Sequence, residues 1–548
     1  MKKDFSINWR TVVFAAVVAY ASWIMLAGKH IVHGDGTEYI LQTQAIALHG
    51  QLQINTTELR EYWNRTNPYG VTLPVPAAPN RLLTESAQAG GRWGGLYPDR
   101  TGTYRYYHFW AYPLAAAPVY LLLHRLTGAP FEYHAFRILN WLLLLSPFIA
   151  AWTRWRSWML AAILALSLFS PLVPYTDWQH PELFCFCLIF FAFWLAASKK
   201  GFWWSPLLLG IATAQNIPIG LLFPLHFFHL WRHHEKEMRS SPLLALGAYG
   251  LAAGVAGGSL LYWQHHFGCF NPIAALGLAD MKYAGLGRVC DIFFSPTVGA
   301  AWLYPTLFLF MPLMLRRRDV PLVAMALVTA AGMAYLASAT RNFNAGQVGS
   351  LRYAVWILAP LWYFLLAADH PEQPHRKAVR TALVAIAVAV NILMIAAFKY
   401  DRLVKKDIRR TGGAWRGIPE VAAIYAALPY NDDIEITVET ILGHELAHPS
   451  LFRGVYIWNL GPHASRWVIA QQGMTNAAPV EWKAAAPFAY RTIPAGNTLF
   501  QFTDGMARLV IPPDARYKEH PCLGKYITVW MDAAVDDPKA RVETTVRP

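Results

Sequence analysis

The sequence predicts an all-α polytopic membrane protein with about eleven transmembrane helices, followed by a C-terminal extramembrane domain that is α/β or β-rich. Of its 548 residues, 55% are hydrophobic and only 15% are charged, which is too apolar for an ordinary soluble protein of this length. Long apolar runs recur from Thr11 to Phe398 and then stop. Residues 1–398 are therefore expected to form the transmembrane domain and residues 399–548 the C-terminal domain.

The expected spans share a predominantly apolar composition. They are residues 11–28, 135–152, 158–175, 182–198, 202–214, 217–231, 243–263, 298–315, 320–339, 353–368 and 379–398. The first run follows a short basic segment and precedes no small-residue cleavage site, so it is expected to be retained as a span. The runs 202–214 and 217–231 are short, and they predict two half-length helices that meet at Gln215-Asn216-Ile217-Pro218.

Lysine and arginine gather between the spans, which explains the net charge of +14 without nucleic acid as a partner. If Met1 is inside and the apolar stretch Tyr112–Leu123 lies on the surface, every basic cluster between spans falls on the cytoplasmic side. These clusters are Lys2-Lys3, Arg154/Arg156, Lys199-Lys200, Arg232–Arg239, Arg316–Arg318 and Arg376–Arg380. The basic residues after the last span lie outside, because long domains translocate largely regardless of charge.

The outer face then holds a long first loop at 29–134, the turn Thr176–Pro181, later loops at 264–297 and 340–352, and the C-terminal domain. That domain alternates short apolar segments with turns, which predicts strands. The expected strands are Ile434–Val438, Val455–Trp458, Trp467–Ala470, Leu509–Ile511 and Tyr526–Trp530.

Of the five cysteines, Cys185 and Cys187 lie inside an apolar run and are expected to be inert, and Cys522 is alone. Cys269 and Cys290 share one outer loop. Because a disulfide persists outside the cytoplasm, a bond between these two is expected; the alternative is two free thiols too far apart to bond.

Two acidic motifs lie next to span ends on the outer face. The first span leads into Asp35 and Glu38, which also have the spacing of a capping box for a helix over Tyr39–Leu48. The second motif is Asp177 with His180 in the turn between two spans, followed by Glu182, which is expected to be a solvated turn residue. A carboxylate with an imidazole at a membrane surface can take a proton from a hydroxyl or hold a divalent metal.

The first outer loop is rich in aromatic residues, most of which are expected to form an interfacial belt. The residues are Tyr62, Trp63, Trp93, Tyr97, Tyr104, Tyr106, Tyr107 and Trp110. Aromatic faces also stack on sugars. Arg100, Arg105 and His108 in the same stretch, with Arg341 and Arg352 in a later outer loop, have the chemistry to hold a lipid phosphate.

These features together resemble the GT-C superfamily of polyprenyl-phosphate-sugar-dependent integral membrane glycosyltransferases. The resemblance covers residues 1–400. It lies in the acidic motif directly after the first span, the long outer loop with surface helices, and the second acid in the next outer turn. The stretch Tyr104–Leu123 is similar to the surface helix before the family's second span, and Leu351-Arg352-Tyr353 is similar to the opening of a late span. Gly36 stands where the family often has a second acid, which argues against a tight metal site.

The resemblance implies a multi-pass protein of the inner (plasma) membrane that moves a sugar from a polyprenyl-phosphate carrier to a hydroxyl acceptor outside. The acceptor would be a cell-envelope glycan, a lipid or a protein. By the same resemblance Asp35 and Asp177 are the catalytic carboxylates, and Glu38, His180, Arg105 and Arg352 bind substrate. A divalent metal is compatible with the two acids, and no nucleotide cofactor is expected because no glycine-rich phosphate loop is present.

Two other function classes stay open. A multi-pass transporter or flippase of a lipid-linked or polar substrate fits the spans, although the halves of the chain show no internal repeat. A zinc metallopeptidase fits the pentapeptide His444-Glu445-Leu446-Ala447-His448. That pattern works only on a helix, and Pro449 with the strand-like residues before it disfavours one, so a chance match is expected.

Overall fold

The computed structural model describes, with short gaps, residues 8–27, 36–54, 96–340 and 352–367, a few positions between 382 and 389, and the strands between 454 and 545. The chain divides into two compact units. Unit 1 comprises Met1–Ala284, Tyr304–Arg341 and Tyr353–Ile392. Unit 2 comprises Gly285–Leu303, Asn342–Arg352 and Leu393–Pro548. This division falls near the expected boundary at residue 398 but adds two earlier segments to the C-terminal part.

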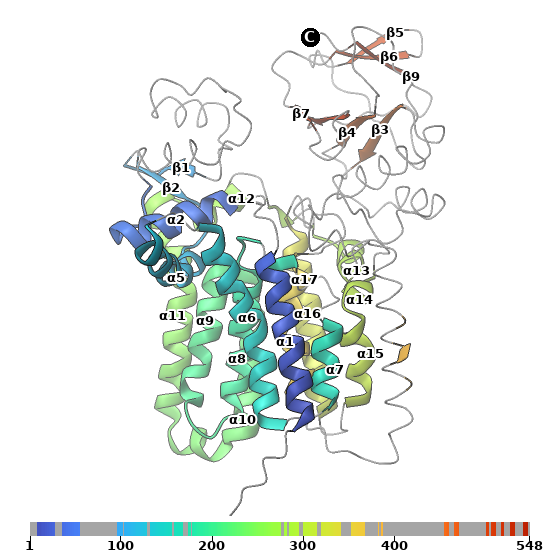
Figure 1. Cartoon of the computed structure of the whole chain (residues 1–548). Coiled ribbons are helices and arrows are strands. Elements are labelled where there is room, and N and C mark those ends of the chain that lie inside the picture. The colour runs from blue at the N-terminus through green and yellow to red at the C-terminus, as the bar shows by residue number, and fades with distance from the viewer. Residues whose placement is uncertain are drawn as a thin grey trace, which may run out of the picture. The chain divides into compact units, whose positions relative to one another are not determined.

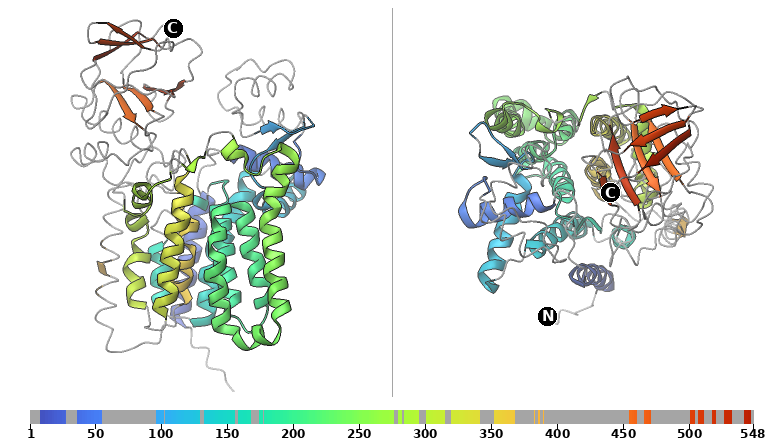
Figure 2. Two further views of the ribbon diagram at one scale, coloured as in Figure 1. Left: turned by 180° about the vertical axis from the view of Figure 1, so that it is seen from behind. Right: turned by 90° about the horizontal axis from the view of Figure 1, so that it is seen from above.

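Unit 1 is a bundle of helices that run side by side (Figures 1 and 2). Its long elements are α1 (Trp9–Ala27), α6 (Glu132–Trp155), α7 (Trp158–Ser167), α8 (Glu182–Ala196), α9 (Ser205–Gln215), α10 (Phe223–Ser240), α11 (Pro242–Phe267), α15 (Pro305–Met314), α16 (Val320–Ser338) and α18 (Ala359–Ala367). Short helices complete it: η1 (Pro174–Thr176), η2 (Phe202–Trp204), η3 (Ile217–Leu222), α12 (Pro272–Ala275) and α17 (Ala354–Ile357).

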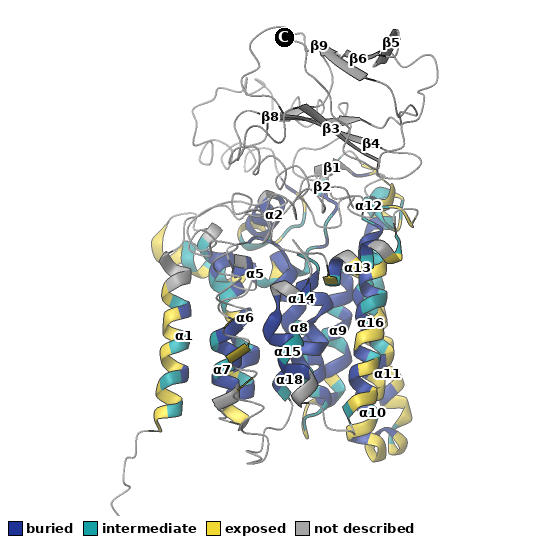
Figure 3. Cartoon of the chain, turned by 90° about the vertical axis from the view of Figure 1, so that its right-hand side faces the viewer, coloured by how far each residue is buried: buried dark blue, intermediate teal, exposed yellow. Residues whose placement is uncertain are grey.

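Burial follows position in the bundle. Helix α8 packs against α6, α9, α10, α17 and α18, and it is buried along most of its length (Figure 3). Helices α1 and α11 are largely exposed, and α11 carries apolar side chains such as Leu246 and Leu261 on its open surface. An apolar exterior around a buried interior is what a helix bundle shows when lipid surrounds it.

Three described helices are long and apolar enough to cross a membrane: His134–Arg154, Pro242–Phe267 and Val320–Ser338. They coincide with the expected spans 135–152, 243–263 and 320–339, and they support a membrane-embedded chain. The other expected spans up to residue 368 also contain helix, some of it short, while 379–398 lies almost wholly outside the described residues. The total of eleven spans stays a prediction.

Two helices, α2 (Gly36–His49) and α5 (Ala111–Thr127), lie across one end of the bundle and pack against each other (Figures 1 and 2). Helix α5 covers the stretch Tyr112–Leu123, for which the charge pattern predicts a surface-lying segment. A two-stranded hairpin, β1 (Leu96–Pro98) and β2 (Tyr104–Tyr106), precedes it. Helix α5 ends at Gly128, whose φ of 68° is a left-handed conformation that suits glycine.

The helical break expected at Gln215–Pro218 is present. Helix α9 ends at Gln215, Asn216 is extended, and the 3₁₀-helix η3 leads into α10. Pro218 cannot continue the α-helical hydrogen bonds of α9, which explains the break. Helix α9 packs close to α11 at Gly210. A Cβ added there would lie 2.5 Å from the carbonyl oxygen of Ala252, so the close approach requires glycine.

Two of the basic residues expected on the cytoplasmic side lie at the end of the bundle opposite α2 and α5. The Arg154 guanidinium lies 5.8 Å from the ring centre of Trp194, near the C-terminal ends of α6 and α8. The Arg232 guanidinium on α10 pairs with the carboxylate of Asp319 before α16 at 3.1 Å. The side of the membrane that this end faces stays a prediction.

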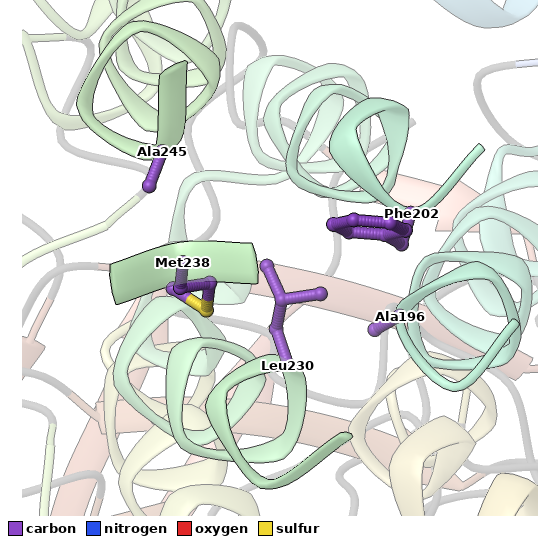
Figure 4. Packing of buried hydrophobic residues seen from close by; sticks show 5 residues of the cluster. All are labelled: Ala196, Phe202, Leu230, Met238 and Ala245. Carbon is purple, nitrogen blue, oxygen red and sulfur yellow. The ribbon is translucent and has the colours of Figure 1, made fainter. Parts of the chain in front are cut away.

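An apolar cluster closes this basic end. It is formed by Ala196, Phe202, Leu230, Met238 and Ala245, which lie on α8, η2, α10 and α11 (Figure 4). The ring of Phe202 also stacks on that of His234 with a centroid separation of 3.8 Å. The cluster packs these helices against one another at this end of the bundle.

Unit 2 contains two short helices, α13 (Leu286–Phe294) and α14 (Ala300–Leu303), and two small sheets. The antiparallel sheet has the strand order β3-β4-β8-β7, formed by Gly454–Asn459, Ser465–Ala470, Tyr526–Met531 and Tyr517–Glu519. The second sheet has the order β5-β6-β9, formed by Phe500–Thr503, Met506–Val510 and Arg541–Thr545, with β6 and β9 parallel.

Four of the five strands expected from the sequence overlap β3, β4, β6 and β8. The fifth, Ile434–Val438, lies outside the described residues. Strands β5, β7 and β9 were not expected. β5 alternates but has only four residues, and β7 and β9 carry charged residues.

The expected disulfide between Cys269 and Cys290 is wrong, since both are free thiols. Cys269 follows the end of α11 in unit 1, and Cys290 lies on α13 in unit 2. Membership of one loop in the sequence constrains the distance between two thiols only weakly. Cys185 and Cys187 are buried free thiols, as expected.

Candidate functional site

The end of the bundle that carries α2 and α5 contains a carboxylate–imidazole pair. Glu38 lies in the first turn of α2, and its Oε2 is 2.6 Å from Nδ1 of His108, in the segment between β2 and α5. The side chain of Glu38 is 2% exposed and that of His108 is 15% exposed. A carboxylate at this distance fixes the orientation and the tautomer of an imidazole.

An aromatic group surrounds this pair and extends to the second sequence motif. The ring of His108 contacts Tyr107 at 4.1 Å and Tyr39 at 5.4 Å between centroids. Tyr39 in turn contacts the rings of Tyr112 at 5.5 Å and His180 at 5.8 Å. His108 and His180, far apart in sequence, therefore contact the same tyrosine ring.

Asn140, fully buried on α6, holds the turn of the second motif. Its Nδ2 donates to the carbonyl oxygen of Trp178 at 2.5 Å and is 3.4 Å from those of Tyr175 and Thr176. Its Oδ1 accepts a hydrogen bond of 2.9 Å from the hydroxyl of Tyr112 on α5. One side chain thus links α5 to the turn around position 177.

The start of α5 is fixed by the tip of the broken helix. The Gln215 side-chain oxygen accepts the backbone N–H of Tyr112 at 3.0 Å, which satisfies a donor that the first turn of a helix leaves without an internal partner. Phe109, adjacent to His108, is buried against Ala214 and Trp263. Gln42 on α2 donates to the carbonyl oxygen of His108 at 3.4 Å. His108 is therefore held through its backbone as well as its ring.

A second polar cluster is centred on Asp99, in the turn of the β1–β2 hairpin. Its carboxylate accepts hydrogen bonds from the backbone and hydroxyl of Thr101 at 2.8 and 2.6 Å and from the backbone of Thr103 at 2.9 Å. Nε of Arg105 donates to it at 2.8 Å, and Nδ1 of His266 at the end of α11 is 3.5 Å away. The hairpin is thereby tied to the α11 end.

Hydrogen bonds and burial shift the pKa values of two groups at this end of the bundle. Burial raises the pKa of the Asp99 carboxyl, but the hydrogen bonds from Thr101, Arg105 and Thr103 outweigh this effect and hold the pKa well below its usual range. Burial also raises the pKa of the Tyr112 phenol well above its usual value. Asp99 is therefore a fixed negative charge, and Tyr112 is a fixed hydroxyl donor.

The sequence-predicted residues are distributed as follows. Glu38 pairs with His108, whose ring contacts Tyr39, and Tyr39 also contacts His180. Arg105 belongs to the Asp99 cluster, where its Nε donates to the carboxylate. Arg352 lies in the turn before α17 and is assigned to unit 2.

Several expected residues lie outside the described part of the chain: Asp35, Asp177, Arg341 and the pentapeptide 444–448. Among the described residues, no group of three or more histidine, cysteine, aspartate or glutamate side chains is arranged to hold a metal ion.

One expectation about exposure is wrong. Glu182 is buried, 2% exposed, at the first position of α8, where the positive end of a helix dipole favours a carboxylate. Of the aromatic residues expected mostly in an interfacial belt, Tyr106 and Tyr107 are buried.

Sequence reasoning missed Asn140, Asp99, Gln215 and His266 as site residues, and it assigned His108 only to phosphate binding. A lone asparagine inside an apolar run is the signal that was available for Asn140, since a polar side chain in a span needs a partner. Asp99 and His266 carry no such signal, because their pairing depends on two distant loops.

No protein-family model matches this chain, and no curated protein matches it. Among solved structures, it is similar to ArnT from Cupriavidus metallidurans bound to undecaprenyl phosphate. The identity is 14%, the match covers 81% of this chain and 72% of that chain, and the TM-score is 0.42.

Proposed function

We propose that the protein is a membrane glycosyltransferase of the GT-C type that moves a sugar from a polyprenyl-phosphate carrier to a hydroxyl acceptor. Its active site would lie at the outer face of the inner membrane, and the acceptor would be a cell-envelope glycan, a lipid or a protein. Asp35 and Asp177 are its proposed catalytic carboxylates.

The observation that supports this most is the meeting of the two acidic motifs. Asp35 directly precedes the first residue of α2, three positions before Glu38. Asp177 stands between Thr176 and Trp178, whose carbonyl oxygens are held by Asn140. Tyr39 contacts both His108 and His180, so described residues four positions after Asp35 and three positions after Asp177 lie in contact. This contact supports a shared site for the two aspartates.

The chemistry needs little else from the protein. One carboxylate takes the proton of the acceptor hydroxyl, and the other orients the acceptor or a divalent metal. The acceptor oxygen then bonds to the anomeric carbon, and the carbon–oxygen bond to the lipid phosphate breaks. Positive charge stabilises the departing phosphate, a role proposed for Arg105 and Arg352. Glu38 and His180 would contact the substrate.

The sidedness follows from charge. The bundle end with Arg154 and Arg232 would face the cytoplasm, because basic residues between spans are retained there. The site end would then face outward, where a lipid-linked sugar is available and no nucleotide sugar is required.

The test is transfer of radiolabelled sugar from synthetic polyprenyl-phosphate donors by the purified full-length protein. Asp35→Asn and Asp177→Asn are expected to lower the rate by about 100- to 10,000-fold while folding and membrane insertion are retained, as for loss of a general base. His444→Ala and His448→Ala serve as controls and should be nearly silent.

Two results would contradict the proposal. Active aspartate variants with an inactive His444→Ala variant would move the chemistry to the C-terminal region. Vesicle transport of a lipid-linked substrate without any sugar transfer would favour the transporter alternative instead.

A further inference from the structure

We infer that Glu38 and His108 form a catalytic dyad in which the proton of the acceptor hydroxyl ends on Nε2 of His108. This inference rests on the proposed glycosyl transfer and adds a residue to its machinery. It changes the expected role of His108 from phosphate binding to proton transfer and places Glu38 behind the imidazole instead of against the substrate. In this refinement Asp35 and Asp177 orient the acceptor or a divalent metal and do not take the proton.

The geometry of the pair carries the argument. Oε2 of Glu38 and Nδ1 of His108 are 2.6 Å apart, which is a short, charge-assisted distance. When a carboxylate accepts the proton on Nδ1, the basic nitrogen of the imidazole is Nε2. The carboxylate also stabilises the imidazolium that forms when Nε2 takes up a proton.

Exposure assigns the two roles. The side chain of Glu38 is 2% exposed, so it is shielded from solvent and from a substrate by its own partners. The side chain of His108 is 15% exposed, so it is the member of the pair that reaches the surface at the bundle end. A buried orienting acid behind a partly exposed imidazole is the arrangement of a proton-accepting dyad.

The surroundings hold His108 in one orientation. Its ring lies between Tyr107 and Tyr39, and its carbonyl oxygen accepts from Gln42. The next residue, Phe109, is anchored in the apolar cluster with Trp263. A group fixed on packed elements in this way transfers protons without a reorientation step.

The titratable groups described around the pair come from two other elements. His180 of the second motif lies beyond the ring of Tyr39, and Arg105 of the hairpin is bound to Asp99. Glu38 is the charged group that directly contacts Nδ1 of His108 in the described part of the chain.

The proposed step balances. The acceptor O–H bond breaks as its oxygen bonds to the anomeric carbon, the bond from that carbon to the phosphate oxygen breaks, and the electron pair leaves with the polyprenyl phosphate. The proton rests on Nε2 of His108 as imidazolium and passes to water before the next turnover.

The experiment measures transfer from a polyprenyl-phosphate sugar between pH 4.5 and 8.5 with the full-length protein. Wild type is expected to lose activity on an acidic limb, as Nε2 becomes protonated. His108→Gln should lower the rate at neutral pH by about 100-fold or more and remove this limb. Imidazole added to His108→Gly should restore part of the rate.

Glu38→Gln provides the readout that a purely structural role would not move. The amide keeps a hydrogen bond to the ring but removes the charge that favours imidazolium, so the limb should shift to lower pH by about one unit or more. His180→Gln should leave the position of the limb unchanged. His49→Gln, on the last turn of the same helix, is the matched control and should leave rate and profile unchanged.

The outcomes separate the two proposals. If wild type transfers no sugar from polyprenyl-phosphate donors, the proposed function fails. If wild type is active but its rate is flat across this range, or folded His108→Gln keeps its rate, the dyad is overturned while the proposed function stands. Should His108→Gln not fold, the wild-type limb and its shift in Glu38→Gln decide the matter.

Discussion

Replacing Asn140 by leucine tests whether one buried amide holds α5 and the turn around Asp177 in register. The substitution removes two short hydrogen bonds, of 2.5 Å to the Trp178 carbonyl oxygen and of 2.9 Å from the Tyr112 hydroxyl. Each leaves a buried polar group without a partner, at a cost of about 1–3 kcal/mol. The free energy of unfolding should therefore fall by about 2–6 kcal/mol.

Denaturant unfolding of the purified protein in detergent measures this change. Asn140→Asp is the sharper variant, because it keeps an acceptor for Tyr112 but loses the N–H donor to the turn. Ser146→Ala on the same helix is the matched control: its hydroxyl bonds only within the helix and to the Cys187 sulfur, and its loss should change the free energy by about 1 kcal/mol or less. Sugar transfer should fall at least about tenfold in Asn140→Asp, because the turn that carries Asp177 loses its support.

A double-mutant cycle with Tyr112→Phe identifies the bond itself. Because Asn140 and Tyr112 share one hydrogen bond, the double variant should be less destabilised than the sum of the two singles, by about 0.5–3 kcal/mol. Full additivity, or an Asn140→Leu variant as stable as wild type, would refute the reasoning.

The depressed pKa of Asp99 means that its carboxylate stabilises the fold above about pH 4 and that this contribution is lost as pH falls through the folded pKa. The difference in free energy of unfolding between wild type and Asp99→Asn should therefore shrink in acid. An equal difference at pH 7 and pH 3 would contradict this. Gly210→Ala should destabilise the bundle by about 1–3 kcal/mol, since the new methyl group would meet the carbonyl of Ala252. Gly254→Ala on α11 places its methyl group in open space and should be tolerated. Denaturant unfolding in detergent compares the two variants. A cysteine at exposed His49 should react with an impermeant thiol reagent from outside and one at Arg239 only from the cytoplasm, in a background without the native thiols; the opposite pattern would invert the topology. Gln179, in the outer turn, is buried and is a poor labelling position.

The positions of the surface helices could be predicted because charge and hydrophobicity act locally. The basic clusters between runs required Tyr112–Leu123 to stay on one side, and α5 lies across the bundle end accordingly. The break at Pro218 was equally visible, since proline lacks the N–H that a helix needs. The disulfide prediction was wrong for the converse reason: loop membership constrains the distance between two thiols only weakly.

The candidate site was predictable only in part. Glu38 and His180 stand out as polar residues at span ends, but their relation through Tyr39 depends on how α2 packs against the turn before α8. The Glu38–His108 pair joins residues 70 positions apart, and the Asn140 bonds cross from α6 to α5 and to the 175–178 turn. No local pattern encodes such pairings.

The sequence by itself predicted a helical membrane chain, the common end for Arg154 and Arg232, and four of the strand segments near the C-terminus. The first two follow from the free energy of transferring a segment between water and lipid, which depends mainly on composition. The strand segments follow from local alternation of apolar and polar residues. Only the tertiary structure decided which polar groups meet at the bundle end. A buried carboxylate, imidazole or amide is stable only with a partner, and the partner is chosen by how distant helices pack.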